Sequence, residues 1–99
     1  MPRTRRISFA ASAIEDLEGV RAWYREREVP EVGERLLREV IAAVERLADF
    51  PESGRVVPES GVAQLRDVIH PPLRIVYRVD KDRVRIVRVC WSERLIRMP

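Results

Sequence analysis

The most constraining feature of this 99-residue sequence is an apolar repeat with helical spacing between residues 33 and 48. Its members recur three or four positions apart, which places them on one face of an α-helix. They are Gly33, Leu36, Leu37, Val40, Ile41, Val44, Leu47 and Ala48. The repeat predicts a helix from Pro30 to about Asp49, because Pro30 fits a first helical turn and Phe50-Pro51 ends the pattern.

A second helix is predicted before it, ending at about Arg27. The sequence Ser12-Ala13-Ile14-Glu15 matches a capping box, in which the Ser12 hydroxyl accepts a hydrogen bond from the Glu15 amide. Val29-Pro30 separates the two helices, so they are expected to form an antiparallel hairpin. The buried stripe of the first helix is predicted to consist of Ala10, Ala13, Ile14, Leu17, Val20 and Tyr24, with Trp23 at its flank.

Outside the helices the apolar spacing changes to alternation, which is typical of β-strands. Strands are predicted over residues 5–9, 65–70, 73–79 and 84–91, with a turn at 80–82. The imperfect alternation of 84–91 favours a central strand covered on both faces. In the clearest strand, one face is predicted to carry Leu73, Ile75, Tyr77 and Val79, and the other Arg74, Val76 and Arg78.

These elements predict an α+β fold in the order β-α-α-β-β-β, with the last three strands as an antiparallel meander and the helix hairpin packed on one face of the sheet. The length fits a single domain over 1–99. No apolar run approaches the roughly 18 residues of a membrane span. No secretory signal is predicted, and the single Cys90 excludes an internal disulfide, so we expect a cytoplasmic protein without membrane contact.

The titratable residues do not predict an enzyme. One cysteine and one histidine, His70, are too few for a zinc site within the chain, so we predict no metal, no cofactor and no catalytic residue. The acids at the start of the first helix are explained by capping and solvation. Cys90 is expected in the core of a central strand. Trp91 has two readings, a stacking platform for a base or a cap on the core.

Charge is divided unevenly along the chain. The overall net charge is +3, but residues 10–50 carry −4 and residues 51–99 carry +4. Of the 19 basic residues only Lys81 is a lysine, a bias that genome base composition also produces. The asymmetry indicates a positive surface for an anionic partner or an acidic peptide.

Arginines of the second half are expected to gather on one sheet face. Arg74 and Arg78 share a face by alternation, and Arg66 together with Arg85 or Arg88 is predicted to lie beside them. Clustered guanidiniums repel one another without anionic partners, and they bind carboxylate or phosphate in a bidentate manner. The alternative is that each arginine pairs with an acid of the same chain or reaches water.

Several motifs together resemble the ParE/RelE superfamily of toxins from type II toxin–antitoxin systems, over nearly the whole chain. Residues 7–24 are similar to the opening strand and first helix of the family. Residues 47–55, Leu-Ala-Asp-Phe-Pro-Glu-Ser-Gly-Arg, resemble its L-x-x-x-P-x-x-G-R helix exit. Residues 73–78 look like its Y-R-I-x-Y-R strand, residues 84–89 like its closing strand, and Arg94 stands at a frequent arginine just beyond.

The resemblance implies a toxin that a small cognate antitoxin wraps and neutralises as a hetero-oligomer. It is closer to ParE, whose members inhibit DNA gyrase, than to RelE, whose members cleave messenger RNA on the ribosome, and we expect a role in plasmid stabilization. The lysine-rich loop of the nucleases is missing, and Met98 stands near their C-terminal tyrosine. Residues 89–94 also differ from the usual ParE stretch, which is rich in His, Gly and Arg.

We therefore predict a gyrase inhibitor that acts by binding. The alternatives are a RelE-like ribosome-dependent endoribonuclease and a degenerate, non-toxic interaction module. The residues predicted to contact the antitoxin or the target are Arg55, Arg66, Arg74, Arg78, Trp91 and Arg94.

Overall fold

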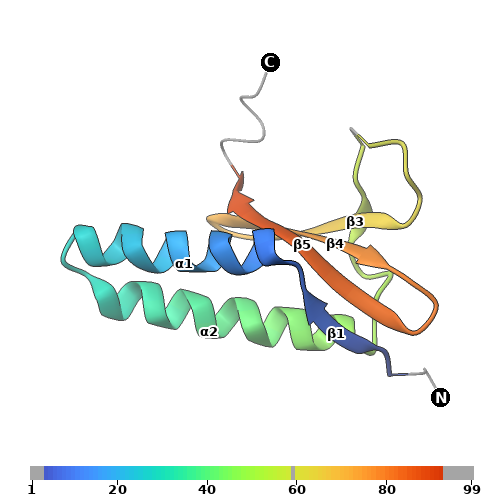
Figure 1. Ribbon diagram of the computed structural model, residues 1–99, viewed down its shortest axis with the longest axis horizontal. Helices are drawn as coiled ribbons and strands as arrows, with labels where there is room; N and C mark the ends of the chain where they lie inside the picture. The colour runs from blue at the N-terminus through green and yellow to red at the C-terminus, as the bar shows by residue number, and fades with distance from the viewer. Residues whose placement is uncertain (1–3, 59, 93–99) are drawn as a thin grey trace.

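The computed structural model describes residues 4–58 and 60–92, and it shows two helices beside one five-stranded sheet (Figure 1). The elements are β1 (Arg6–Phe9), α1 (Ala11–Glu26), α2 (Pro30–Leu47), β2 (Arg55–Val56), β3 (Leu65–His70), β4 (Leu73–Val79) and β5 (Arg83–Trp91). The predicted α+β fold is confirmed. The structure adds β2, a two-residue strand that is too short to show alternation.

The strand order β1-β5-β4-β3-β2 places the first and last strands of the chain side by side. β1 runs parallel to β5, and the remaining neighbours are antiparallel, so the predicted meander of β3, β4 and β5 is confirmed. β1 pairs only with residues 83–86 of β5. The later part of β5 therefore extends beyond the edge strand, and α1 lies beside it.

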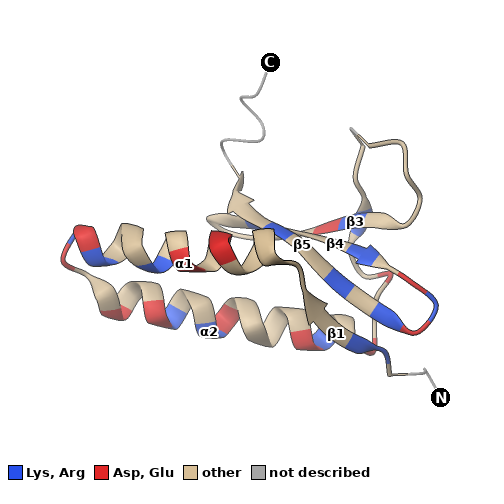
Figure 2. Cartoon of the chain, viewed as in Figure 1, with Lys and Arg blue, Asp and Glu red and all other residues tan. Residues whose placement is uncertain are grey.

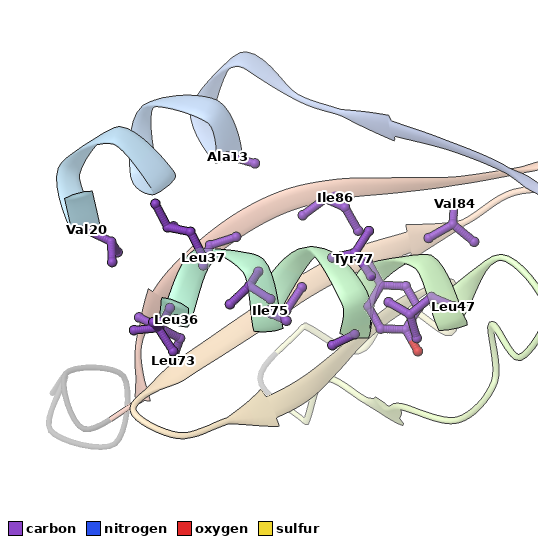
Figure 3. Packing of buried hydrophobic residues seen from close by; sticks show 14 residues of the cluster. Ala13, Val20, Leu36, Leu37, Leu47, Leu73, Ile75, Tyr77, Val84 and Ile86 are labelled. Atoms are coloured by element: carbon purple, nitrogen blue, oxygen red, sulfur yellow. The ribbon is translucent and has the colours of Figure 1, made fainter. Parts of the chain in front are cut away.

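The hydrophobic core lies between the helix hairpin and one face of the sheet (Figure 3). The predicted inward residues Leu73, Ile75 and Tyr77 of β4 are fully buried. The α2 side of the core consists of Leu36, Leu37, Val40, Ala43, Val44 and Leu47. The predicted stripe does not include Ala43, which is buried. Ile41 of α2 and Ile14 of α1, which the predicted stripes do include, are 39% and 46% exposed. Both are wrong predictions, since each lies about 100° around its helix from the stripe's centre.

The capping box predicted at Ser12 does not form. α1 begins at Ala11 with Ala10 as its N-cap, and no side chain caps it. The Ser12 hydroxyl instead donates a 2.7 Å hydrogen bond to the carbonyl of Val87, and the amide of Ala10 donates to the carbonyl of Ile86. The Ser12 hydroxyl, which the local sequence predicted to cap α1, therefore bonds to the free edge of β5 instead.

The imperfect alternation of β5 has a different cause from the one predicted. Val76 is paired with Arg88, whereas the next residue, Tyr77, is paired with Ile86, so β5 contains one extra residue at this point. Such a β-bulge reverses the alternation, and it lets both Ile86 and Val89 point into the core. Both faces of β5 carry apolar residues because of the bulge, and the helix hairpin covers only one of them.

Candidate functional site

A groove of about 760 Å³ lies beside the free edge of β5, and its floor residues Arg74, Val76, Arg88 and Cys90 belong to the sheet face that points away from the core, which we call the outer face. One wall is α1 and the other is the segment after β2, while β4 and β5 form the floor. Its lining consists of Glu15, Asp16, Gly19, Val20, Trp23, Val57, Ser60, Arg74, Val76, Arg88, Val89, Cys90 and Trp91. Because the groove is concave and combines apolar rings with charged side chains, it is the candidate site.

A buried ion-pair network forms the floor of the groove. Asp67 of β3 and Arg74 of β4 are 2% and 5% exposed, and Arg74 Nε donates to Asp67 Oδ2 at 2.6 Å. Arg55 of β2 donates through Nε to the other carboxylate oxygen at 2.9 Å. The strand register explains the arrangement, because Arg55 lies directly opposite Asp67. One carboxylate therefore joins three strands, and removing it would leave a buried guanidinium without this partner.

The α1 wall is attached to β5 through Asp16. Its Oδ2 accepts hydrogen bonds of 2.8 Å from Arg88 Nε and from the backbone amide of Val89. The hydrogen bond to Asp16 raises the pKa of the Arg88 guanidinium above its usual value. Because Asp16 satisfies an amide at the free edge of β5, the carboxylate holds the helix beside the bulge.

Three aromatic rings close one end of the groove. The ring centroids of Trp23 and Trp91 are 5.2 Å apart, and Tyr24 lies 4.8 Å from Trp23 in an edge-on arrangement. Arg27 stacks over Trp23 with its guanidinium carbon 3.7 Å from the ring centroid. Trp91 packs against the core, which agrees with the reading of this residue as a cap.

The Gly54-Arg55 motif has a structural explanation that sequence reasoning missed. The Tyr77 hydroxyl donates to the carbonyl of Pro51 at 2.7 Å and accepts from the amide of Gly54 at 3.0 Å. Burial raises the pKa of Tyr77 above 10. A Cβ on Gly54 would meet the Tyr77 hydroxyl and the Asp67 carbonyl at once, so only glycine fits. The motif thus fixes the exit from α2 against the sheet and delivers Arg55 to Asp67.

The predicted arginine cluster is only partly assembled. Arg78 is on the outer face, as predicted, and pairs with Asp80 at 3.2 Å. Arg66 lies opposite Tyr77 and therefore on the other face, where it donates to the Gly54 carbonyl at 2.7 Å. Its predicted position beside Arg74 is wrong because alternation was counted within each strand without the register between strands. Arg94 lies outside the described residues.

Figure 2 shows basic positions on β1, β4 and β5 near the turn between β4 and β5, and the strand register places a second group of arginines there on the outer face. Arg6 of β1 lies opposite Arg83 of β5, and Arg78 of β4 lies opposite Arg85 of β5. We call Arg6, Arg78, Arg83 and Arg85 the arginine patch. The parallel pairing of β1 with β5 brings residues 6 and 83 together, and nothing in the local sequence signals that pairing.

Other classes of site receive no support from the part of the chain that the structure describes. Within residues 4–58 and 60–92, no three His, Cys, Asp or Glu residues are grouped so that they could hold a metal ion. No described helix has the length and hydropathy needed to cross a membrane. Burial raises the pKa of the Cys90 thiol in the groove, which disfavours the reactive thiolate.

The fold is similar to that of chains in solved structures of toxin–antitoxin systems. The chain is similar to a chromosomal ParDE system from Pseudomonas aeruginosa, with 20% identity, a TM-score of 0.75, and coverage of 90% of this chain and 97% of that one. The RelBE2 complex from Mycobacterium tuberculosis gives 22% identity, a TM-score of 0.65 and coverage of 89% and 98%. The DinJ-YafQ complex from Escherichia coli gives 13% identity, a TM-score of 0.58 and coverage of 93% and 97%. At these identities the likeness establishes the fold.

The sequence itself establishes the family. Residues 7–95 match the model of the ParE toxin of the type II toxin–antitoxin system parDE, so the chain belongs to the ParE toxin family. No curated protein sequence matches the chain. The class of protein is therefore a toxin of a type II toxin–antitoxin system in the ParE/RelE superfamily.

Proposed function

We propose that this chain is a cytoplasmic ParE-like toxin that binds and inhibits DNA gyrase and is neutralised by a cognate antitoxin in a hetero-oligomer. The observation that carries the proposal is the match of residues 7–95 to the ParE toxin family. The gyrase target follows from the resemblance of the sequence to ParE members. The antitoxin partner is supported by the likeness in fold to toxins solved as ParDE and RelBE2 assemblies.

The groove favours binding over phosphate cleavage. Glu15 and Asp16 are anionic groups of its wall, and Asp67 holds the guanidinium of Arg74 on its floor. A scissile phosphate needs several cations that are free to stabilise charge in the transition state. The two guanidiniums named in the lining are instead engaged with carboxylates, Arg88 with Asp16 and Arg74 with Asp67. The lining therefore supports a protein ligand more than a messenger RNA.

Of the residues predicted as contacts, those on the surface keep that role in the proposal. Arg55 and Arg78 have side chains that are 60% and 54% exposed, although each pairs with a carboxylate of this chain. Trp91 is half-buried at the end of the groove. Arg74 is too deeply buried for a large contact, so we assign it to holding the sheet face in shape.

The test is induced expression of the chain with and without the product of the neighbouring reading frame. We expect growth arrest with the chain alone and recovery when both proteins are made. Purified chain is expected to inhibit supercoiling by DNA gyrase, and the neighbouring protein is expected to reverse the inhibition.

Two outcomes would contradict the proposal. Codon-phased cuts in messenger RNA, measured by primer extension after induction, would establish the RelE-like activity instead. Normal growth, with unaffected gyrase and translation at saturating protein, would establish a degenerate interaction module.

A further inference from the structure

The arginine patch is a concentration of positive charge with little internal compensation. Arg78 and Arg85 are cross-strand neighbours, and so are Arg6 and Arg83. Like charges in such positions repel each other. Among the described residues, Asp80 is the carboxylate that pairs with the patch, at 3.2 Å from Arg78 and 3.9 Å from Arg83. Four guanidiniums thus share one paired carboxylate.

The other charged groups around the patch do not cancel this excess. Asp82 borders Arg6 and Arg83 in a small surface hollow, and Lys81 stands beside it in the turn before β5. Arg5 also approaches this turn, because its Nε donates to the carbonyl of Asp80 at 3.2 Å. The two acids of the turn are therefore outnumbered, and the patch attracts anions.

The arginine patch and the groove lie on the same sheet face and share β4 and β5. Arg85 belongs to the patch and Cys90 to the groove floor, five residues further along β5. Because β5 contains the bulge between them, their partners on β4, Arg78 and Arg74, are only four residues apart, so at about 3.3 Å per residue the two positions are about 13 Å apart. Val76 and Arg88, which are paired across the two strands, lie between them and also line the groove.

We propose that this outer face is a two-part docking surface for one peptide segment of the antitoxin. Acidic side chains of the segment pair with the arginine patch, and a large apolar side chain fills the groove beside Trp23 and Trp91. The spacing of about 13 Å corresponds to about four residues of an extended segment or about nine of a helix. This inference rests on the antitoxin partner of the proposed function, and it adds where and by what chemistry that partner binds.

The groove is the reason to favour an acidic peptide over a nucleic acid. A phosphate backbone satisfies arginines, but it offers no apolar group for the space between Trp23, Val57 and Trp91. On the groove wall the Arg88 guanidinium is already paired with Asp16, and the Glu15 carboxylate repels phosphates. A segment that is acidic at one end and apolar at the other is complementary to both parts.

Gly19 provides a selective way to block the groove. It lines the groove from α1, and a Cβ added there meets no atom within 4 Å. Gly19→Leu places a large apolar side chain on this wall of the groove from a Cβ position that is open, and Gly19→Ala is the matched control because it adds a single methyl group. For the patch, Arg85→Glu reverses one charge. Arg35→Glu makes the same change on the exposed surface of α2.

The experiment measures the Kd between each purified variant and the protein encoded by the neighbouring reading frame, at several salt concentrations. Circular dichroism melting curves verify that each variant is folded. We expect Gly19→Leu and Arg85→Glu each to weaken binding by about tenfold or more, and the two controls to change it by less than about threefold. Arg85→Glu is also expected to reduce the salt dependence of binding.

Three results would overturn the inference in distinguishable ways. If the wild-type chain is toxic and is neutralised, but both test variants bind the antitoxin normally, the docking surface is wrong and the proposed function stands. If Arg85→Glu weakens binding to a 30-base-pair DNA duplex and leaves antitoxin binding unchanged, the patch is a nucleic-acid site. If the wild-type chain neither arrests growth nor binds the neighbouring protein, the proposed function fails, and the inference fails with it.

Discussion

At the scale of single residues, the space around each glycine determines whether a side chain can be added there. Gly54 lies where Tyr77 and the backbone of Asp67 leave no room for a side chain. Gly33 similarly faces Tyr24, because a Cβ added at Gly33 would lie 2.9 Å from the Tyr24 Cβ. Gly19, by contrast, lies in open space on an exposed part of α1. Three glycines of one chain therefore have different physical consequences when replaced by alanine.

We expect Gly54→Ala to lower the free energy of unfolding by about 2–3 kcal/mol, because the added methyl group overlaps the Tyr77 hydroxyl and a backbone carbonyl. Gly19→Ala is expected to raise it by about 0.5–1 kcal/mol, since alanine favours a helix interior. Urea denaturation of both variants measures the two effects. Equal effects of the two substitutions would show that the close approach at Gly54 carries no strain.

The buried Tyr77 hydroxyl predicts a loss of stability at alkaline pH. Its pKa is raised above 10 in the folded chain, chiefly by burial, so the folded state favours the neutral phenol. This contribution is complete below pH 10 and is lost as the pH rises through the folded pKa. Urea midpoints measured from pH 8 to 11 should fall more steeply for the wild type than for Tyr77→Phe. Parallel curves would contradict the prediction.

At the scale of the elements, contacts at the edge of β5 replace the expected local ones. The Ser12 hydroxyl, the Ala10 amide and the Asp16 carboxylate all bond to the backbone of β5 beyond the end of β1. α1 therefore takes the place of an edge strand. This arrangement also positions the α1 wall of the groove, since Asp16 contributes to both.

This arrangement predicts different effects for the two ends of the supposed capping box. Ser12→Ala removes the hydrogen bond to Val87 and is expected to destabilise the fold by about 1 kcal/mol. Glu15→Gln is expected to change stability by less than about 0.5 kcal/mol, because no side chain caps α1. Thermal or urea unfolding of both variants tests this. A comparable loss of stability for Glu15→Gln would show that the capping box forms and would contradict the prediction.

At the scale of the whole molecule, one core is shared by the hairpin and the sheet. α1, α2, β4 and β5 all contribute fully buried or nearly buried residues to it. The outer face is left to the groove and the arginine patch. A single core joins the two layers, so neither is expected to persist without the other.

We therefore expect cooperative unfolding in a single transition. The aromatic cluster of Trp23 and Trp91 reports on the junction of α1 with β5, and circular dichroism reports on the helices as a whole. Urea curves from tryptophan fluorescence and from far-ultraviolet circular dichroism should coincide. Separate midpoints would show that the hairpin and the sheet unfold independently.

Local patterns in the sequence by themselves determined both helices, the three meander strands β3, β4 and β5, and the inward face of β4. They also determined the resemblance to the ParE/RelE superfamily. These follow from spacing along a single element, where burial imposes a period of 3.6 or 2. The tertiary structure alone decided the bulge in β5, the side on which Arg66 lies, the burial of Arg74 against Asp67 and the assembly of the arginine patch. Each of these depends on the register between strands, and for the arginine patch also on the pairing of β1 with the distant β5. The register is set by packing and by backbone pairing across the whole sheet.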